Sequence, residues 1–305
     1  MYSRLQLARK YLRYYLTAAN GKGHGIHSPF VFDFIIHVLN DTRDFPEYAV
    51  IRQLRRQLER DPAILEIEDM GAGSALNGTR RRSVAELARH AAKPEKLGQL
   101  LFRIARYYRC VSILELGTSL GISTAYLAEG GKVAGGEGAR VITIEGADAV
   151  AGVAERNFRS LGLEGPGLDM PGLQRLGPDV AGLEGRGLDV PGLERPGLGN
   201  VELVRGNFDQ VLAPVLDRIG HVDLAFVDGN HRREPTLRYF EQILERCSLQ
   251  AVLIFDDIHW SAEMEDAWEQ IKKDARVYLT IDLFFIGLVF LRSEFKVKQD
   301  FTIRY

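Results

Sequence analysis

The chain has 305 residues, 46% of them hydrophobic, and its 39 basic and 41 acidic side chains give a formal net charge of −2. This length is enough to bury one large α/β core together with an accessory segment. A charge so close to neutral creates no overall field that favours nucleic acid or an anionic membrane surface, so we expect neither as a partner.

Export and membrane insertion are not expected from the sequence. Residues 1–20 scatter arginine and lysine among apolar positions, whereas a signal peptide needs a continuous apolar stretch. No apolar run approaches the length that spans a bilayer. The only cysteines, Cys110 and Cys247, lie far apart beside strand patterns, which predicts buried free thiols rather than a disulfide or a metal site. These features suit the cytoplasm.

The first part of the chain, residues 1–108, is predicted to form a helical extension or lid. Apolar residues recur three and four apart, the spacing that lines one face of a helix, in residues 5–16, 28–39 and 48–60. Ser83 and Glu86 have the spacing of a capping box that opens a further helix. Pro94 suits the first turn of another helix, predicted over residues 94–108.

The rest of the chain, residues 109–305, is predicted to be one α/β domain. Short apolar runs typical of strands occupy residues 111–116, 140–146, 200–206, 222–229, 251–257, 276–284 and 287–292. Amphipathic helices are expected between them, over residues 123–130, 147–161, 208–219, 234–247 and 261–273. Strict alternation of strand and helix predicts a parallel sheet with helices on both faces. The last two strands leave no room for a helix, so the last of the seven must run antiparallel to its neighbour.

Residues 163–199 interrupt this alternation with a decapeptide repeat. The segments GLDMPGLQRL, GPDVAGLEGR and GLDVPGLERP follow one another, and their glycine and proline content disfavours both helix and strand. A small solenoid is the alternative, but the copies are few and lack β-branched rungs. We predict an insertion without chemistry, because its removal leaves an ordinary connection between a helix and a strand.

Two segments have the form of a strand that ends in a glycine loop: ILEIEDMGAG, residues 64–73, and ILELGTSLG, residues 113–121. In an open parallel sheet, the ligand lies beyond the carboxyl end of such a strand, where glycine lets the backbone approach and a helix N-terminus follows. The second segment meets both conditions, because Gly117 and Gly121 flank the turn and a helix follows.

A ribose-binding acid at the end of the next strand is the further requirement for a nucleotide site. Glu145 provides it for the second segment. The first segment is followed by no strand that ends in an acid, so its Asp69, Gly71 and Gly73 are expected in a surface loop or in the lid. The sequence therefore places the nucleotide site at residues 113–121.

Acidic residues follow two further strands of the predicted sheet. Asp228 ends one strand, and Asp256 and Asp257 end the next. The carboxyl ends of neighbouring parallel strands lie about 5 Å apart, so these carboxylates can converge on one point. Three like charges there repel one another unless a cation or protons intervene. Ligands that are all oxygen favour magnesium, calcium or manganese over zinc.

The segment ELGTSLGISTAYLA, together with the antiparallel last strand, resembles the class I S-adenosylmethionine (SAM)-dependent methyltransferases and, more narrowly, the catechol-type O-methyltransferases. A dinucleotide site would instead read GxGxxG. The resemblance implies a Rossmann-like fold and SAM as the cofactor. It also implies a set of cofactor-binding residues: Glu115 and Gly117 at the methionine amino end, Ser123 at the carboxylate, Thr118, Ser119 and Gly121 in the turn, Glu145 at the ribose, Asn207 and Phe208 near the adenine, and Asp228 at the amino group.

The resemblance extends to the metal-dependent O-methyltransferases through the spacing of Asp228 from the pair Asp256 and Asp257. It implies a Mg²⁺ ion bound by these three carboxylates, which would orient a substrate hydroxyl and lower its pKa. His231 stands where that family has a lysine, in a DGxH form known from related sugar and natural-product enzymes, and would accept the hydroxyl proton.

Structural alternatives exist for each residue of this cluster. Asp228 could bond the cofactor amino group without a metal, Asp256 could cap the following helix, and His231 could simply bond its own loop. Two flanking residues, His259 and Trp260, are candidates for shaping a substrate pocket.

The sequence therefore predicts an enzyme of class EC 2.1.1 that methylates a hydroxyl of a small-molecule acceptor, with SAM and Mg²⁺. The alternatives are a module that binds a cofactor or partner without catalysis, and an NAD(P)-dependent oxidoreductase on a similar sheet. An exposed N-terminal amphipathic helix allows a homodimer. The histidines of HGIHSPF, residues 24–30, form a weaker candidate site, since helix capping by Ser28 and Pro29 explains half of that motif.

Overall fold

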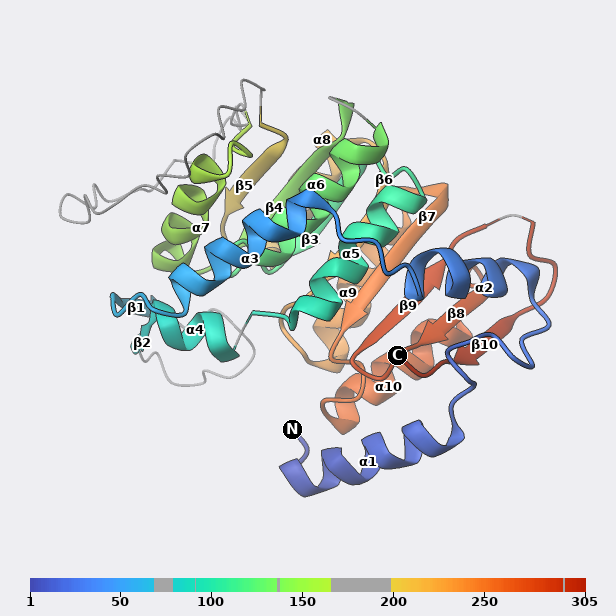
Figure 1. The fold of residues 1–305 in the computed structure, drawn as a ribbon. Helices are drawn as coiled ribbons and strands as arrows, with labels where there is room; N and C mark the ends of the chain where they lie inside the picture. The colour runs from blue at the N-terminus through green and yellow to red at the C-terminus, as the bar shows by residue number, and fades with distance from the viewer. Residues whose placement is uncertain (69–78, 91, 136–137, 166–198, 293) are drawn as a thin grey trace.

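The computed structural model describes residues 1–68, 79–90, 92–135, 138–165, 199–292 and 294–305. Its centre is a twisted eight-stranded sheet with the order β10-β8-β9-β7-β6-β3-β4-β5 (Figure 1). The strands of this sheet are β3 (Ser112–Leu116), β4 (Arg140–Glu145), β5 (Val201–Arg205), β6 (Val222–Val227), β7 (Cys247–Asp256), β8 (Leu279–Asp282), β9 (Ile286–Phe290) and β10 (Gln299–Thr302).

The topology confirms the predicted, mostly parallel sheet, but the sheet has one strand more than predicted. Strands β3 to β7 pair in parallel, and β9 lies antiparallel between β7 and β8. The prediction of seven strands was wrong by one, because β10 from the unassigned C-terminal tail pairs in parallel with β8. Half of the residues in β10 are exposed, so this edge strand lacks the apolar run that marks the others.

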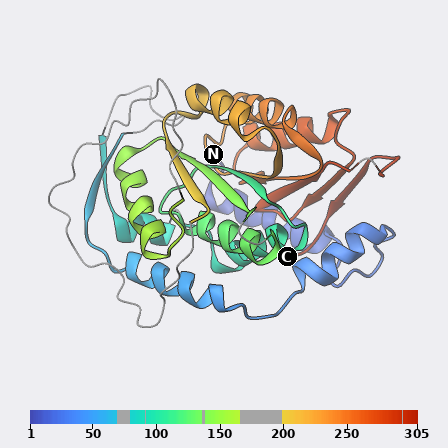
Figure 2. The ribbon, with the colours of Figure 1, turned by 90° about the horizontal axis from the view of Figure 1, so that it is seen from above.

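Helices cover both faces of the sheet, as Figure 2 shows from above. One face carries α2 (Pro29–Phe34), α3 (Pro46–Leu58), α5 (Glu95–Tyr107), α6 (Ile122–Gly135) and α7 (Asp148–Ser160). The other face carries α8 (Phe208–Ile219), α9 (Arg233–Leu244) and α10 (Ala262–Lys273). Side chains alternate between the two faces along each strand, so that Ile113 enters the first core and Leu114 the second.

The segment before β3 is helical, as predicted, but it also contains a hairpin. Strand β1 (Ile64–Glu68) pairs antiparallel with β2 (Thr79–Ser83), so the first ILE run is a hairpin strand outside the main sheet. Helix α4 (Val84–His90) follows, and Ser83 and Glu86 form the predicted capping box across its first turn. The predicted loop residues Asp69, Gly71 and Gly73 lie outside the described residues.

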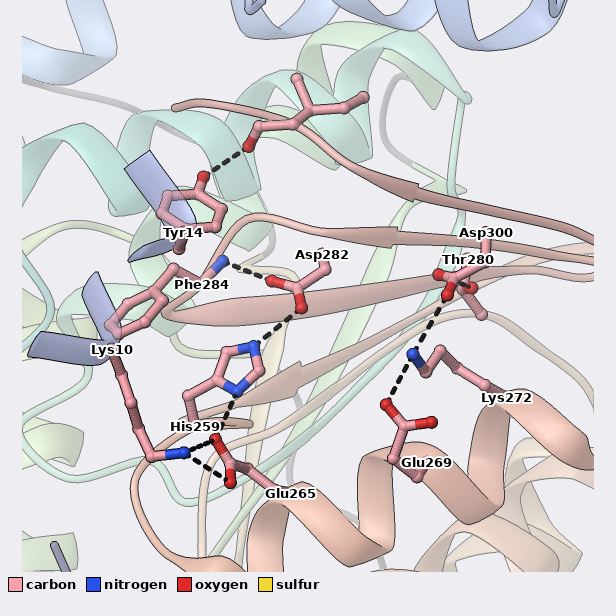
Figure 3. A network of polar contacts seen from close by, with 11 residues as sticks. Lys10, Tyr14, His259, Glu265, Glu269, Lys272, Thr280, Asp282, Phe284 and Asp300 are labelled. Atoms are coloured by element: carbon pink, nitrogen blue, oxygen red, sulfur yellow. Dashed lines mark hydrogen bonds and ion pairs between the residues drawn. The ribbon is translucent and has the colours of Figure 1, made fainter. Parts of the chain in front are cut away.

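Helix α1 (Arg4–Thr17) is joined to the far edge of the sheet by a polar network (Figure 3). The Lys10 ammonium lies 2.9 Å from a Glu265 carboxylate oxygen. His259 Nδ1 lies 3.0 Å from Glu265, and His259 Nε2 lies 2.7 Å from Asp282. Tyr14 donates a hydrogen bond to the backbone carbonyl of Ile303. The N-terminal helix is therefore bound to Glu265 of α10 and to Ile303, which follows β10.

Three smaller predictions can be placed in the fold. Cys110 and Cys247 are free thiols, the first buried and the second half-buried. Most of the decapeptide repeat lies outside the described residues, and an isolated bridge pairs Glu164, near its start, with Val201, just after its end. Among the described residues, no helix is both long enough and apolar enough to span a bilayer.

Candidate active site

A cavity of about 600 Å³ opens at the carboxyl ends of the central strands. Its floor is formed by the loops that follow β3, β4, β5, β6 and β7, and the lid contributes residues from β1, β2, α4 and the α4–α5 connection. This is the end of an open parallel sheet where ligands bind, and the volume lies within the range of small-molecule and cofactor sites. The second ILE segment therefore leads into the cavity, as predicted.

The turn after β3 contains residues with a positive φ, a conformation that glycine adopts more readily than other residues. Gly117 has a φ of +98°, and a Cβ atom there would lie 2.0 Å from the carbonyl oxygen of Asp228. Ser119, two residues further, has a φ of +49°. Glycine at 117 thus lets the turn after β3 pass directly against the loop after β6.

Glu145 lies at the end of β4 and lines the cavity beside this turn. Its Oε2 accepts a hydrogen bond of 2.8 Å from the amide of Ser119, and its Oε1 accepts one of 2.9 Å from the amide of Ala147. Burial raises the pKa of Glu145, although these amides oppose the rise. Each carboxylate oxygen keeps a further lone pair, which a pair of hydroxyl groups could use.

Glu115 lies inside the sheet and does not line the cavity. Its side chain is fully buried, and Oε2 accepts hydrogen bonds of 2.5 Å from Thr124 and 2.7 Å from Thr143. Its Oε1 has no hydrogen-bond partner among the described residues. Burial raises the pKa of Glu115 to about 7, against the lowering effect of these hydroxyl groups.

The other cofactor-binding residues from the sequence divide into two groups. Gly117, Ser119, Asn207, Phe208 and Asp228 line the cavity with Glu145. Thr118, Gly121 and Ser123 are not part of the lining; they shape the turn behind it. Thr118 shares a 2.6 Å hydrogen bond with Thr143, and Gly121 would place a Cβ 2.5 Å from the Phe158 ring. Asn207 also caps α8 by accepting a hydrogen bond from the Asp209 amide.

The predicted acidic cluster forms, and it already contains a cation. Lys93, from the connection between α4 and α5, places its Nζ 3.1 Å from Asp228 Oδ1. The same nitrogen forms an ion pair and hydrogen bond with Asp256 Oδ2. The side chains of Lys93 and Asp228 are each 16% exposed, whereas that of Asp256 is 1% exposed. Sequence reasoning missed Lys93 because it lies 163 residues before its partner.

In this cluster, the pKa of each titrating group depends on the charges of its neighbours. Burial alone would lower the pKa of Lys93, but Asp228, Asp256 and Asp257 raise it well above the ordinary lysine value, so the ammonium stays charged. Burial and the charge of Asp228 raise the pKa of Asp256, whereas Lys93 lowers it. The pKa of Asp257 is also raised, first by burial. One ammonium therefore balances part of the charge of three carboxyl groups.

The predicted metal ligands are only partly brought together. Among the described residues, the set that could hold an ion is Asp228, His231 and Asp256, with donor atoms within 4.8 Å of one another. Asp257 lines the cavity but is not in this set, so the structure brings His231 where the sequence predicted Asp257. His231 Nε2 lies 3.6 Å from Asp228 Oδ1, which is longer than a hydrogen bond.

Left-handed backbone is concentrated at the cavity. Five non-glycine residues of the described chain have a positive φ, and three of them, Ser119, Asn230 and Asp257, line the cavity. Such conformations cost of order 1–3 kcal/mol each and gather at functional sites. The turns after β3, β6 and β7 therefore each contain a non-glycine residue in the left-handed conformation, which packing alone does not require.

Two further candidates from the sequence have different positions. Trp260 lines the cavity, as suggested, but His259 points away from it into the network with Glu265 and Asp282 (Figure 3). His24 and His27 are exposed and line no part of the cavity. Pro29 is at the first position of α2, as predicted, but Ser28 makes no side-chain capping bond, so that part of the prediction was wrong.

Comparisons with known proteins agree with this geometry. The family described as "Methyltransferase domain" matches residues 114–258, from β3 through the loop after β7. A search of curated proteins gives no significant match.

Solved structures share the fold at low sequence identity. SAH-bound PaMTH1, a methyltransferase from Podospora anserina, is 13% identical, with 96% of this chain and 98% of that chain covered and a TM-score of 0.52. Cofactor-bound Rv0187 from MTB is 17% identical, with 86% and 95% covered and a TM-score of 0.51. An O-methyltransferase from Bacillus cereus in complex with SAH is 18% identical, with 82% and 93% covered and a TM-score of 0.46.

The sequence match begins in the strand that leads into the glycine turn and ends just after the Asp256–Asp257 pair, so it contains the floor of the cavity. Strand β9 is antiparallel to both of its neighbours, β7 and β8, and it is the strand that the sequence predicted to be antiparallel. Residues 114–258 therefore match a methyltransferase domain, and the chain shares the fold of the SAH-bound methyltransferase PaMTH1.

Proposed function

We propose that the chain transfers a methyl group from SAM to a hydroxyl oxygen of a small molecule held in the cavity. One observation carries this proposal: the glycine turn, Glu145 and the pair Asp228 and His231 all open onto the same cavity. A nucleotide-binding loop and a proton acceptor thus share one cavity, as a transfer between two bound molecules requires.

The residues present fit the cofactor. Glu145, with one free lone pair on each oxygen, is suited to the ribose hydroxyl groups. Phe208 and Asn207 provide a ring and an amide at the same end of the cavity as Glu145. The sulfonium supplies an activated methyl group when SAM is bound.

When bound, SAM would supply the methyl group: a bond would form between the substrate oxygen and the methyl carbon. The carbon–sulfur bond would break with its electron pair left on sulfur, which would give S-adenosylhomocysteine (SAH). His231 Nε2 accepts the hydroxyl proton, and Asp228, 3.6 Å away, stabilises the imidazolium that results. Residues from β1, β2, α4 and the α4–α5 connection form one side of the cavity.

A metal ion does not fit the cluster as it stands. Carboxylate oxygens and an imidazole are suitable donors for a divalent ion. However, the Lys93 ammonium already lies between Asp228 and Asp256, the two oxygen donors of this set. Magnesium assistance remains a prediction from the sequence, and no step of the proposed reaction depends on it.

Calorimetric titration with SAH tests the cofactor. We expect SAH to bind with one site per chain, and Glu145→Ala to weaken binding by at least about 10-fold, since two ribose hydrogen bonds are lost. Glu155→Ala is the matched control, because Glu155 pairs with Arg205 outside the cavity. Binding of NADH in place of SAH, or unchanged SAH binding in Glu145→Ala, would contradict the assignment.

Turnover tests the base once an acceptor is found by screening hydroxyl compounds for SAH release. His231→Ala should lower kcat by about 100-fold, the scale of general-base catalysis, while SAH affinity stays the same. His221→Ala is the control, since His221 is 61% exposed and lies at the start of β6, away from the cavity. An unchanged kcat in His231→Ala would exclude this residue as the base.

A further inference from the structure

Lys93 reaches the acidic cluster from a separate part of the chain. It immediately precedes Pro94, the N-cap residue of α5, whereas Asp228 and Asp256 follow β6 and β7. Its Nζ lies 3.1 Å from Asp228 and pairs also with Asp256, and only 16% of its side chain is exposed. The Lys93 side chain thus loses most of its conformational freedom, and its single charge lies between two carboxylates.

The carboxylates need such a charge. Asp256 is almost completely buried, and a buried ionised group is stable only when it is paired. The Lys93 ammonium pairs with this buried carboxylate and with Asp228 beside it.

A divalent ion and Lys93 compete for the same place. A metal ion would lie about 2.0–2.6 Å from each carboxylate oxygen, which is the region between Asp228 and Asp256 that the Lys93 nitrogen occupies. A charged ammonium has no lone pair to offer as a ligand, and it repels a second cation at this distance. The two occupants exclude each other.

We propose that Lys93 is the built-in cation of this site and holds Asp228 and Asp256 in place of a divalent metal. The inference deepens the proposed function and rests on it in assigning the cavity to methyl transfer. Lys93 then positions Asp228 beside His231, and the lid that carries it completes the site. The chain should accordingly be a methyltransferase whose acidic cluster binds no metal in its native form.

Titration with Mn²⁺, followed by electron paramagnetic resonance, tests this inference on the full chain. The native chain should bind no stoichiometric Mn²⁺, whereas Lys93→Ala should bind one ion per chain on the order of 100-fold more tightly, because the competing charge is gone. That new site should disappear in the double variant Lys93→Ala/Asp256→Asn. Lys96→Ala is the matched control; Lys96 lies over the Tyr305 ring and should leave metal binding unchanged.

Two results would overturn the inference. The first is one Mn²⁺ ion bound by the native chain and lost in Asp256→Asn, which would mean that a metal displaces Lys93. The second is a folded Lys93→Ala chain that binds no ion. If Lys93→Ala does not fold, Lys93→Met, which keeps most of the volume, takes its place. SAH titration of the same samples separates this failure from a failure of the proposed function, because loss of SAH binding in the native chain refutes only the latter.

Discussion

Replacement of Glu115 by glutamine should remove a measurable pH dependence of folding stability. Glu115 is fully buried in β3, and burial raises its pKa to about 7 from an ordinary value of 4.5. Between these two pH values the folded chain holds a proton that the unfolded chain has released. Stability therefore falls as the pH rises from about 4.5 to about 7, and stays level above that.

The size of this effect follows from the pKa shift. Each pKa unit corresponds to about 1.4 kcal/mol, so the full penalty is about 3 kcal/mol, of which about 2.5 kcal/mol falls between pH 5 and pH 8. Glutamine resembles the protonated carboxyl group in shape and carries no charge. The difference in the free energy of unfolding between Glu115→Gln and the native chain should therefore move by about 2.5 kcal/mol in favour of the variant over this range.

Urea unfolding of both chains at pH 5, 6, 7 and 8, without ligand, measures this difference. Because the other titrating groups are common to both chains, they cancel in the comparison. A difference that stays constant with pH would refute the reasoning, since it would mean that Glu115 is ionised in the folded state at pH 5.

Three further outcomes follow from the structure. Gly117→Ala should destabilise the chain more than Gly25→Ala, because Gly25 has a similar positive φ but open space where a Cβ atom would lie. Only Gly117→Ala should abolish SAH binding. Equal losses of stability in urea unfolding would exclude the close approach of Gly117 to the loop after β6. Burial lowers the pKa of His259, but Asp282 and Glu265 raise it above the ordinary value. The stability lost in His259→Gln should therefore be greatest below about pH 6.5 and should shrink as the pH rises through the pKa of the folded state. Thermal unfolding of both chains from pH 5 to 9 measures this difference. Asp257→Asn should weaken SAM binding more than SAH binding, because only SAM carries the sulfonium charge; equal losses by calorimetry would contradict an electrostatic role.

The sheet could be predicted in detail because its signals are local. Each strand from β3 to β9 is a short apolar run between turn residues, and its antiparallel last pair follows from the absence of room for a helix. Strand β10 could not be predicted in the same way. It is a half-exposed edge strand whose pairing depends on the outer edge of β8 and not on its own pattern.

The site could be predicted where one strand and its loop define it. Gly117, Glu145, Asp228 and His231 each follow a recognisable strand, and the structure brings them to one cavity. The lid side could not be predicted, because Lys93 has no motif of its own. What places it is the packing of α5 against the sheet, a contact between distant segments that no local pattern records.

The residues of the site come from both sides of the predicted domain boundary. The predicted boundary at residue 108 separates a lid from a sheet domain, and it leaves Lys93 on one side and Asp256 on the other. If the α4–α5 connection moved away from the sheet, Asp228 and Asp256 would both lose Lys93 as a partner. These ion pairs therefore exist only while that connection is docked. The boundary divides the sequence, but the site belongs to both parts, and chemistry at the cavity depends on the N-terminal segment as much as on the glycine turn.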